Sequence, residues 1–151
     1  MEAKDFINEY FNKYPNIKKY MDHQIDFAKA NQFVETIFKR KINIKGINDK
    51  NFAIRGFAER QAINAPIQGS AADIIKLAMI KIHNEIKINN IDAKMLLQVH
   101  DELIFEVENK KREELVNQVK DIMENVHLKY KNFSVPLTVD FGFGNNWGQA
   151  H

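Results

Sequence analysis

At residues 95–108 the chain reads MLLQVHDELIFEVE, an apolar run with three charged or titratable residues at its centre. The halves on either side of His100 and Asp101 each have the length and composition of a strand, which predicts a hairpin. A tight hairpin usually places glycine at its turn, so turn formation alone explains His100, Asp101 and Glu102 poorly. The residues expected to lie in a dry environment are Leu97, Val99, Leu103 and Phe105. A carboxylate at the tip of such a hairpin suits Mg²⁺, which accepts oxygen ligands; the alternative is a solvent-facing acidic turn.

The composition is that of a globular protein. The 151 residues are 44% hydrophobic and 28% charged, with no cysteine. They therefore contain no disulfide framework or thiolate metal site. No stretch approaches the length of a membrane span, and the N-terminus is too polar for a signal peptide. We expect a cytoplasmic protein with no membrane partner.

The net charge of +2 indicates little about partners, but the distribution of the basic residues is uneven. Residues 38–45, FKRKINIK, contain Lys39, Arg40, Lys41 and Lys45 and no acidic residue. Such a patch can contact phosphates, so Lys39, Arg40 and Lys41 are candidate phosphate contacts. The alternative is a basic hairpin whose charges are simply solvated.

The remaining patterns predict helices packed on an antiparallel sheet. Residues 3–31 are helical in pattern, and Pro15 is expected to bend or divide that helix. Two short strands are expected at 33–44, around a basic turn, followed by a loop at 46–51. One helix is predicted from about 52 to 65, stopping near Pro66, and a second after Gly69 to about 88, with Ser70 and Asp73 resembling a capping box. A further helix is predicted at 111–127, and a last strand at 136–144.

Three polar residues of the first of those helices are spaced four apart. On a continuous helix Arg60, Asn64 and Gln68 lie on one face, although Pro66 is expected to disturb the register before Gln68. A guanidinium beside two amides can bind phosphates and the minor-groove edges of bases. Exposed residues that contact only solvent are the alternative.

Two segments together resemble a known family. AERQAINAPIQGSAADIIKLAMI followed by LLQVHDELIFEVE is similar to the C-terminal part of family A DNA polymerases, the bacterial DNA polymerase I type. The resemblance continues through YFNKYPNIKKYM, FVETIF, PLTVDFGFG and NNWGQAH, and so covers nearly the whole chain. It implies an α+β fold in which an antiparallel palm sheet, made of the motif C hairpin and the C-terminal strand, packs on helices. It further implies fingers-base and palm helices with the basic hairpin at about 1–68, and palm at about 69–151.

The resemblance also implies roles for individual residues. Asp101 matches the palm aspartate that binds the catalytic metals, and Glu102 matches the adjacent, less important carboxylate. His100 matches a catalytic-site histidine close to the primer terminus. Arg60, Asn64 and Gln68 match residues that contact primer–template DNA on its backbone and minor groove. The implied cofactor is Mg²⁺, two ions in the intact site, with Mn²⁺ as an alternative.

Some of the family's parts have no counterpart in these 151 residues. The second metal-binding aspartate, in a DYSQIELR-like strand, is absent, as is the fingers helix that binds the deoxynucleoside triphosphate. Two-metal nucleotidyl transfer needs both ions fixed. We therefore expect the chain alone to be inactive, as part of a DNA-directed DNA polymerase whose N-terminal segments are partners supplied from elsewhere. A non-catalytic DNA-binding palm remnant is the alternative, and metal-dependent nuclease activity is a weaker one.

Two further expectations follow from the resemblance. The surface that the missing segments would cover should be apolar and should favour self-association. The family commonly has Phe-Gly-Arg-Arg-Arg where this chain has residues 38–42, and a proline in place of Lys45. Loss of that glycine at Lys39 suggests that the turn differs, or that the constraint on it was relaxed.

Overall fold

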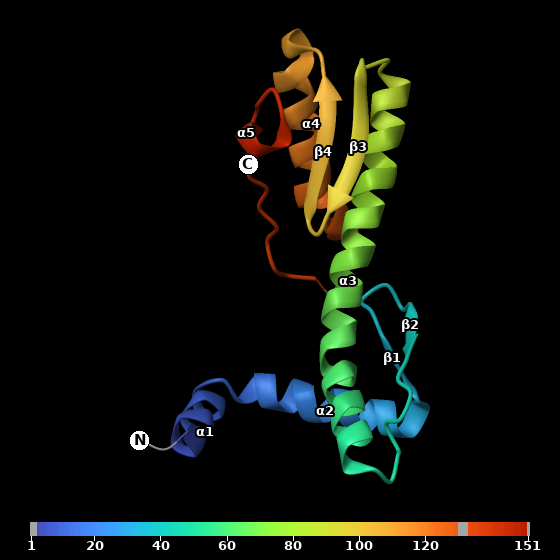
Figure 1. Ribbon diagram of the computed structural model, residues 1–151, viewed down its shortest axis with the longest axis vertical. Coiled ribbons are helices and arrows are strands. Elements are labelled where there is room, and N and C mark those ends of the chain that lie inside the picture. The colour runs from blue at the N-terminus through green and yellow to red at the C-terminus, as the bar shows by residue number, and fades with distance from the viewer. Residues whose placement is uncertain (1–2, 130–132, 151) are drawn as a thin grey trace. The chain divides into compact units, whose positions relative to one another are not determined.

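A computed structural model describes residues 3–129 and 133–150. Figure 1 shows helices together with two separate hairpins. The elements are α1 (Ala3–Lys13), α2 (Pro15–Asn31), β1 (Phe33–Glu35), β2 (Lys41–Asn43), α3 (Phe52–Ile88), β3 (Ala93–Val99), β4 (Glu102–Val107), η1 (Asn109–Lys111), α4 (Arg112–Asn125), η2 (Val126–Lys129) and α5 (Trp147–Ala150). The expected α+β class is confirmed.

The chain forms two compact units, residues 1–70 and 71–151, whose terminal residues 1, 2 and 151 lie outside the described part. Helix α3 belongs to the first unit through Ser70 and to the second from Ala71. The assignment of about 1–68 to fingers base and basic hairpin, and of about 69–151 to palm, stays a prediction.

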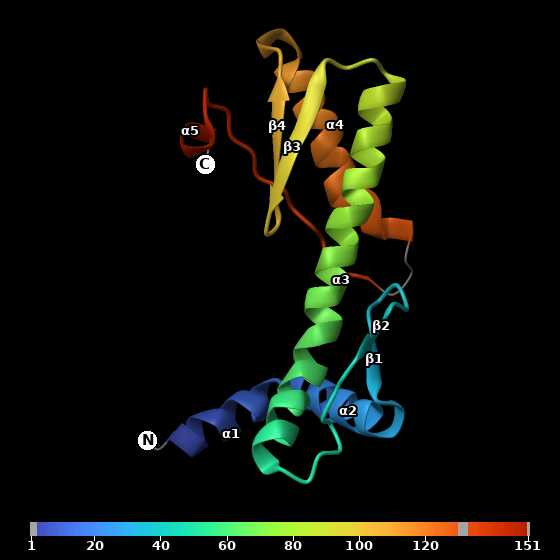
Figure 2. The ribbon, with the colours of Figure 1, turned by 45° about the vertical axis from the view of Figure 1, so that its right-hand side comes forward.

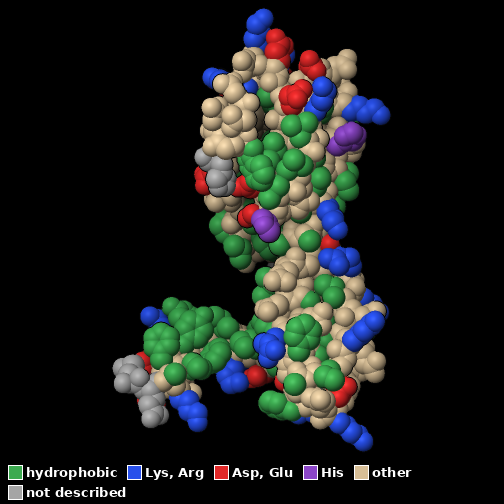
Figure 3. Space-filling model, viewed as in Figure 1, with side chains coloured by type: hydrophobic (Ala, Val, Ile, Leu, Met, Phe, Trp, Pro, Cys, Tyr) green, Lys and Arg blue, Asp and Glu red, His purple; other side chains and the backbone are tan. Residues whose placement is uncertain are grey.

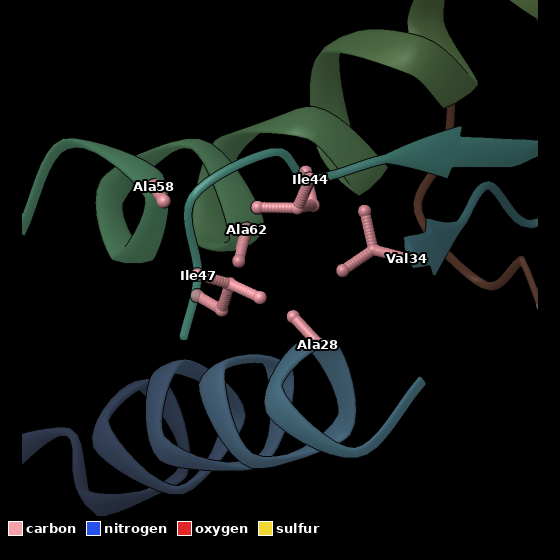
Figure 4. Packing of buried hydrophobic residues seen from close by; sticks show 6 residues of the cluster. All are labelled: Ala28, Val34, Ile44, Ile47, Ala58 and Ala62. Atoms are coloured by element: carbon pink, nitrogen blue, oxygen red, sulfur yellow. The ribbon is translucent and has the colours of Figure 1, made fainter. Parts of the chain in front are cut away.

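The first unit has a small core between α2, the β1–β2 hairpin and the beginning of α3. Pro15 opens α2 at its first turn, so the predicted division of the N-terminal helix is confirmed. Figure 4 shows the core side chains directed toward one another from α2, β1, α3 and the loop after β2. They are Ala28, Val34, Ile44, Ile47, Ala58 and Ala62. The two alanines of α3 let the hairpin and α2 approach the helix closely.

Helix α1 contributes nothing to that core, because none of its described residues is buried. Its large apolar side chains remain exposed, with Phe6 at 66% and Ile7 at 52%. Figure 3 shows hydrophobic side chains gathered over this helix. An apolar surface of this kind is typical of a contact with another chain or segment.

The second unit packs two helices on one face of the β3–β4 hairpin (Figure 2). Ala78 and Ile82 of α3 and Val126 of η2 are buried at the centre. Partly buried residues of the hairpin and of α4 surround them: Met95, Leu103, Phe105, Val119, Ile122 and Met123. Because a two-stranded hairpin is marginal in water, this helix packing is what stabilises the sheet.

The register of the hairpin corrects one prediction. Met95 pairs with Phe105 and Leu97 with Ile104, with an irregularity between Met95 and Leu97. An extra residue in one strand shifts the alternation of its side chains by one position. Leu103 and Phe105 therefore face the helices as expected, whereas Leu97 is on the opposite face and 44% exposed.

The predicted helix break at Pro66 is wrong. Proline removes the amide that would bind the carbonyl four residues earlier, and this normally ends or kinks a helix. Here α3 continues through Pro66. The Tyr20 hydroxyl of α2 donates to the Ile63 carbonyl at 3.0 Å, and the Ser70 hydroxyl donates to the Pro66 carbonyl at 2.5 Å. These two side chains add hydrogen bonds to carbonyls of the helix turns beside the proline. Ser70 lies within the helix and does not cap it.

The predicted strand at 136–144 is also wrong, since these residues belong to neither hairpin sheet. The segment instead contacts α4. The Val139 amide donates to Glu124 Oε1 at 2.9 Å. The Arg112 guanidinium lies 5.0 Å from the centre of the Phe143 ring, and Lys120 Nζ lies 5.9 Å from that of Phe141. The alternating aromatic residues are used in cation–π contacts instead of a strand ladder.

Candidate functional site

The spacing of Arg60, Asn64 and Gln68 produces the surface that the sequence predicts. All three are exposed on α3, and together with Phe57, Gln61 and Ala65 they line one groove of the first unit. Pro66 therefore leaves their register intact. A cation and two amides along one groove can bind an anionic backbone and hydrogen-bond acceptors together.

Three residues of this groove were not predicted from the sequence: Phe57, Gln61 and Ala65. Phe57 and Gln61 line it beside Arg60 and Asn64, and Phe57 is 63% exposed. Phe57 lies three residues before Arg60, and Gln61 lies three residues before Asn64, so the same helical spacing would have found them. An exposed aromatic ring in a polar groove offers a flat surface on which a base or sugar can pack.

The acidic turn of the second unit is a two-residue connection between β3 and β4. Val99 pairs with Glu102, leaving His100 and Asp101 as the turn residues. His100 has a φ of 52°, a left-handed conformation that costs a non-glycine residue roughly 1–2 kcal/mol. Gln98 Nε2 donates to the His100 carbonyl at 2.8 Å and supports the turn. Strain of this kind persists where the surroundings hold it, often at functional sites.

The turn places the two carboxylates differently. Asp101 is exposed at the tip, while Glu102 is half-buried as the first residue of β4. Their oxygens are ligands of the kind that Mg²⁺ and Mn²⁺ accept. Within residues 3–129 and 133–150, no three acidic or histidine side chains cluster as a metal centre. The two carboxylates of the turn have the ligand chemistry of a hard cation site but do not by themselves make up such a cluster.

Three cations of the basic hairpin, Lys39, Arg40 and Lys41, each have a contact within the first unit. Lys39 Nζ lies 3.3 Å from Glu35 Oε2, and Lys41 Nζ lies 4.3 Å from the centre of the Phe33 ring. Arg40 Nη2 donates to the Gly69 carbonyl of α3 at 3.0 Å. Their predicted role as phosphate contacts stays a prediction.

Lys39 has a φ of 66°, so the turn between β1 and β2 adopts the left-handed conformation that glycine takes without strain. Thr36 is almost fully buried beside it, and its hydroxyl accepts from the Phe38 and Arg40 amides, each at 3.3 Å. The turn therefore has the conformation for which a glycine is suited, with lysine in its place.

Comparisons with known proteins agree with the resemblance over almost the whole chain. The sequence model of DNA polymerase family A matches residues 1–149. A DNA polymerase I from Caldicellulosiruptor bescii is 50% identical over 147 residues, which are 97% of this chain and 17% of that protein. A DNA polymerase I from Streptococcus pneumoniae is 47% identical over 149 residues, 99% of this chain and 16% of that protein.

A solved structure is also similar. It is the POL domain of Pol1 from M. smegmatis in complex with DNA primer-template and dNTP, with a TM-score of 0.90 and 38% identity. The match covers 98% of this chain and 25% of that one. This chain thus spans about a sixth of the length of the curated relatives that it matches. Among the described residues, no helix combines the length and apolar character needed to cross a membrane.

Proposed function

The chain belongs to DNA polymerase family A, and from this premise we propose that it is the C-terminal portion of a DNA-directed DNA polymerase. In this proposal Asp101 and Glu102 supply carboxylate oxygens to the metal site, and His100 lies close to the primer terminus. Arg60, Asn64 and Gln68 bind primer–template DNA. The observation that carries the proposal is the exposed Asp101 carboxylate on a strained turn of a hairpin that two helices support.

The residues of the turn suit this role physically. A two-stranded hairpin packed on helices holds its tip more rigidly than a loop does, and nucleotidyl transfer depends on positioning. Bound divalent ions, Mg²⁺ or Mn²⁺, would activate the primer hydroxyl and neutralise charge on the leaving pyrophosphate. Asp101 would bind them directly. Glu102 is half-buried and would contribute less.

The rest of the metal site and the deoxynucleoside triphosphate site would come from polypeptide outside these 151 residues. One acidic turn cannot hold two hydrated ions together with a triphosphate. We therefore propose that the isolated chain does not extend a primer, and that it does so only together with the other polymerase segments.

A chimera tests this proposal. Residues 1–149 would replace the matching stretch of the C. bescii relative, and primer extension would be measured with Mg²⁺ and all four deoxynucleotides. We expect extension by the chimera, its loss by at least a hundredfold in Asp101→Asn, and little change in Asp92→Asn, an exposed aspartate of the same unit. Equal activity of the two variants would show that Asp101 does not bind the metal ions.

The groove on α3 separately favours a second candidate, a DNA-binding module without chemistry. In that case the isolated chain binds primer–template DNA in a salt-sensitive manner. Arg60→Ala should weaken binding, whereas Asp101→Asn should not. Lys19→Ala, which removes an exposed cation of α2, is the charge-matched control. An equal loss of affinity in the two cation variants would indicate only general electrostatic attraction.

A further inference from the structure

The turn between β1 and β2 is bonded to one particular turn of α3. The guanidinium of Arg40 donates from Nη2 to the Gly69 carbonyl at 3.0 Å. The Ile37 amide donates to the Ser70 hydroxyl oxygen at 3.0 Å. We call these contacts, between the residue 36–40 turn and Gly69–Ser70, the hairpin–helix clamp.

The clamp depends on close packing at Gly69, which is buried. A Cβ at this position would lie 2.7 Å from Ile42 Cδ1 and 2.8 Å from Thr36 Cγ2. Both distances are shorter than a van der Waals contact, so the hairpin can approach the helix only because residue 69 has no side chain. Arg40 Nη2 would itself lie 3.2 Å from that Cβ.

The same turn of α3 carries Gln68. Gln68 is exposed in the groove with Arg60 and Asn64, while its neighbours Gly69 and Ser70 are buried under the hairpin. Pro66 lies two residues earlier, where the helix lacks one of its own hydrogen bonds. The backbone that positions Gln68 is therefore held from the opposite side by the clamp.

We propose that Arg40 is a positioning residue that fixes the α3 turn bearing Gln68, in addition to any phosphate contact. The inference rests on the proposed function, since it acts through the contact of Gln68 with DNA. Guanidinium suits the task because its charge is permanent and its donors are held in a rigid plane. A lysine at the same position keeps the charge but not this geometry.

The first test needs no DNA. Amide hydrogen exchange would be followed in residues 67–73 of the wild-type chain, of Arg40→Lys and of the control Lys45→Arg, an exposed cation just beyond β2. We expect the amides to exchange about fivefold faster in Arg40→Lys, because losing one hydrogen bond makes local opening of the helix easier by about that factor. Exchange in the control should be unchanged. Unchanged exchange in Arg40→Lys would overturn the positioning role.

The second test measures the affinity for fluorescent primer–template DNA of the wild type, Arg40→Lys, Gln68→Ala and the double variant. We expect Arg40→Lys to weaken binding about fivefold with an unchanged salt dependence, and to have no further effect once Gln68 is alanine. A pure phosphate contact predicts the reverse: near wild-type binding by Arg40→Lys, and a salt slope smaller by about one in Arg40→Ala. That result would overturn the proposal.

The two tests separate the inference from the function on which it rests. If wild-type chain and chimera both fail to bind primer–template DNA, the proposed function is wrong and the role of Arg40 in DNA binding falls with it. The exchange experiment then still decides whether Arg40 holds the turn. If the wild type binds and the effects of Arg40→Lys and Gln68→Ala simply multiply, the function stands and the inference fails.

Discussion

Gly56 and Gly69 of α3 offer a matched pair of substitutions to alanine. In an open helix position, glycine to alanine stabilises by about 1 kcal/mol, through backbone entropy and helix propensity. A Cβ at Gly56 would meet only Arg60 Nη1, at 3.8 Å, which is an ordinary contact. We therefore expect Gly56→Ala to raise the free energy of unfolding by about 1 kcal/mol.

At Gly69 the added methyl group of alanine would clash with the β1–β2 hairpin. The added Cβ would lie 2.7 Å from Ile42 Cδ1 and 2.8 Å from Thr36 Cγ2. Thr36 is 2% exposed and β-branched, so its methyl group cannot move aside easily. Overpacking of this kind costs about 1–3 kcal/mol, which offsets or exceeds the gain in helix propensity. The net effect should be a loss of about 0–2 kcal/mol.

Urea denaturation followed by circular dichroism measures both variants. The informative quantity is the difference between them, because the helix-propensity gain is common to both and cancels. We expect Gly69→Ala to be less stable than Gly56→Ala by about 1–3 kcal/mol, with similar denaturant slopes. Equal stabilisation by the two substitutions would show that the hairpin does not press on the helix at Gly69, and would refute the clamp.

Three other predictions concern separate parts of the molecule. Lys39→Gly should stabilise the chain by about 0.5–1 kcal/mol in the same assay, because glycine adopts the positive φ of that turn without strain; no gain would mean that the turn is unstrained. Burial raises the pKa of the Tyr20 phenol, so its contribution to stability is present below about pH 10 and is lost as the pH rises through the raised pKa. Tyr20→Phe should therefore lessen the alkaline loss of stability, and an unchanged alkaline profile would contradict this. The exposed apolar side chains of α1 and of the hairpin face that carries Leu97 predict self-association that grows with concentration in sedimentation experiments. A monomer at all concentrations would count against this.

Most elements of the fold could be predicted because their signals are local. Apolar spacing indicated the helices, and alternation around His100 and Asp101 indicated the β3–β4 hairpin. The continuity of α3 could not be predicted, because the local rule ends or kinks a helix at a proline, whereas this long helix loses only one of its own hydrogen bonds at Pro66 and continues. The burial of Leu97 was predicted wrongly because the irregularity between Met95 and Leu97 cannot be recognised from the amino-acid composition of the strand.

The C-terminal segment shows why alternation of side chains alone cannot predict a strand. Residues 136–144 have the alternation of a strand, yet their aromatic rings contact Arg112 and Lys120 of α4. Alternation indicates an extended backbone with two faces, but it does not say whether a neighbouring strand is available to pair with it.

The residues of the candidate site could be predicted, but the contacts that hold their backbone in place could not. Helical spacing brought Arg60, Asn64 and Gln68 onto one groove, as the structure shows. The contact of Arg40 with the Gly69 carbonyl was not foreseen, because a cation in a basic run suggests an external anion. The glycine itself was a signal, since glycine within a helical pattern often marks close approach by another segment.

The attachment of the C-terminal segment to α4 has a consequence for the lifetime of the intact polypeptide. Residues 136–144 belong to no described helix or strand, and their contacts with α4 include a hydrogen bond from the Val139 amide to Glu124 and two cation–π contacts. Detaching them should therefore take less free energy than opening a packed helix. Proteolysis acts on such briefly detached segments. Phe141 and Phe143 are 57% and 42% exposed, and a protease specific for aromatic residues should cut after them first. The chain would then shorten from its C-terminal side while both cores remain folded.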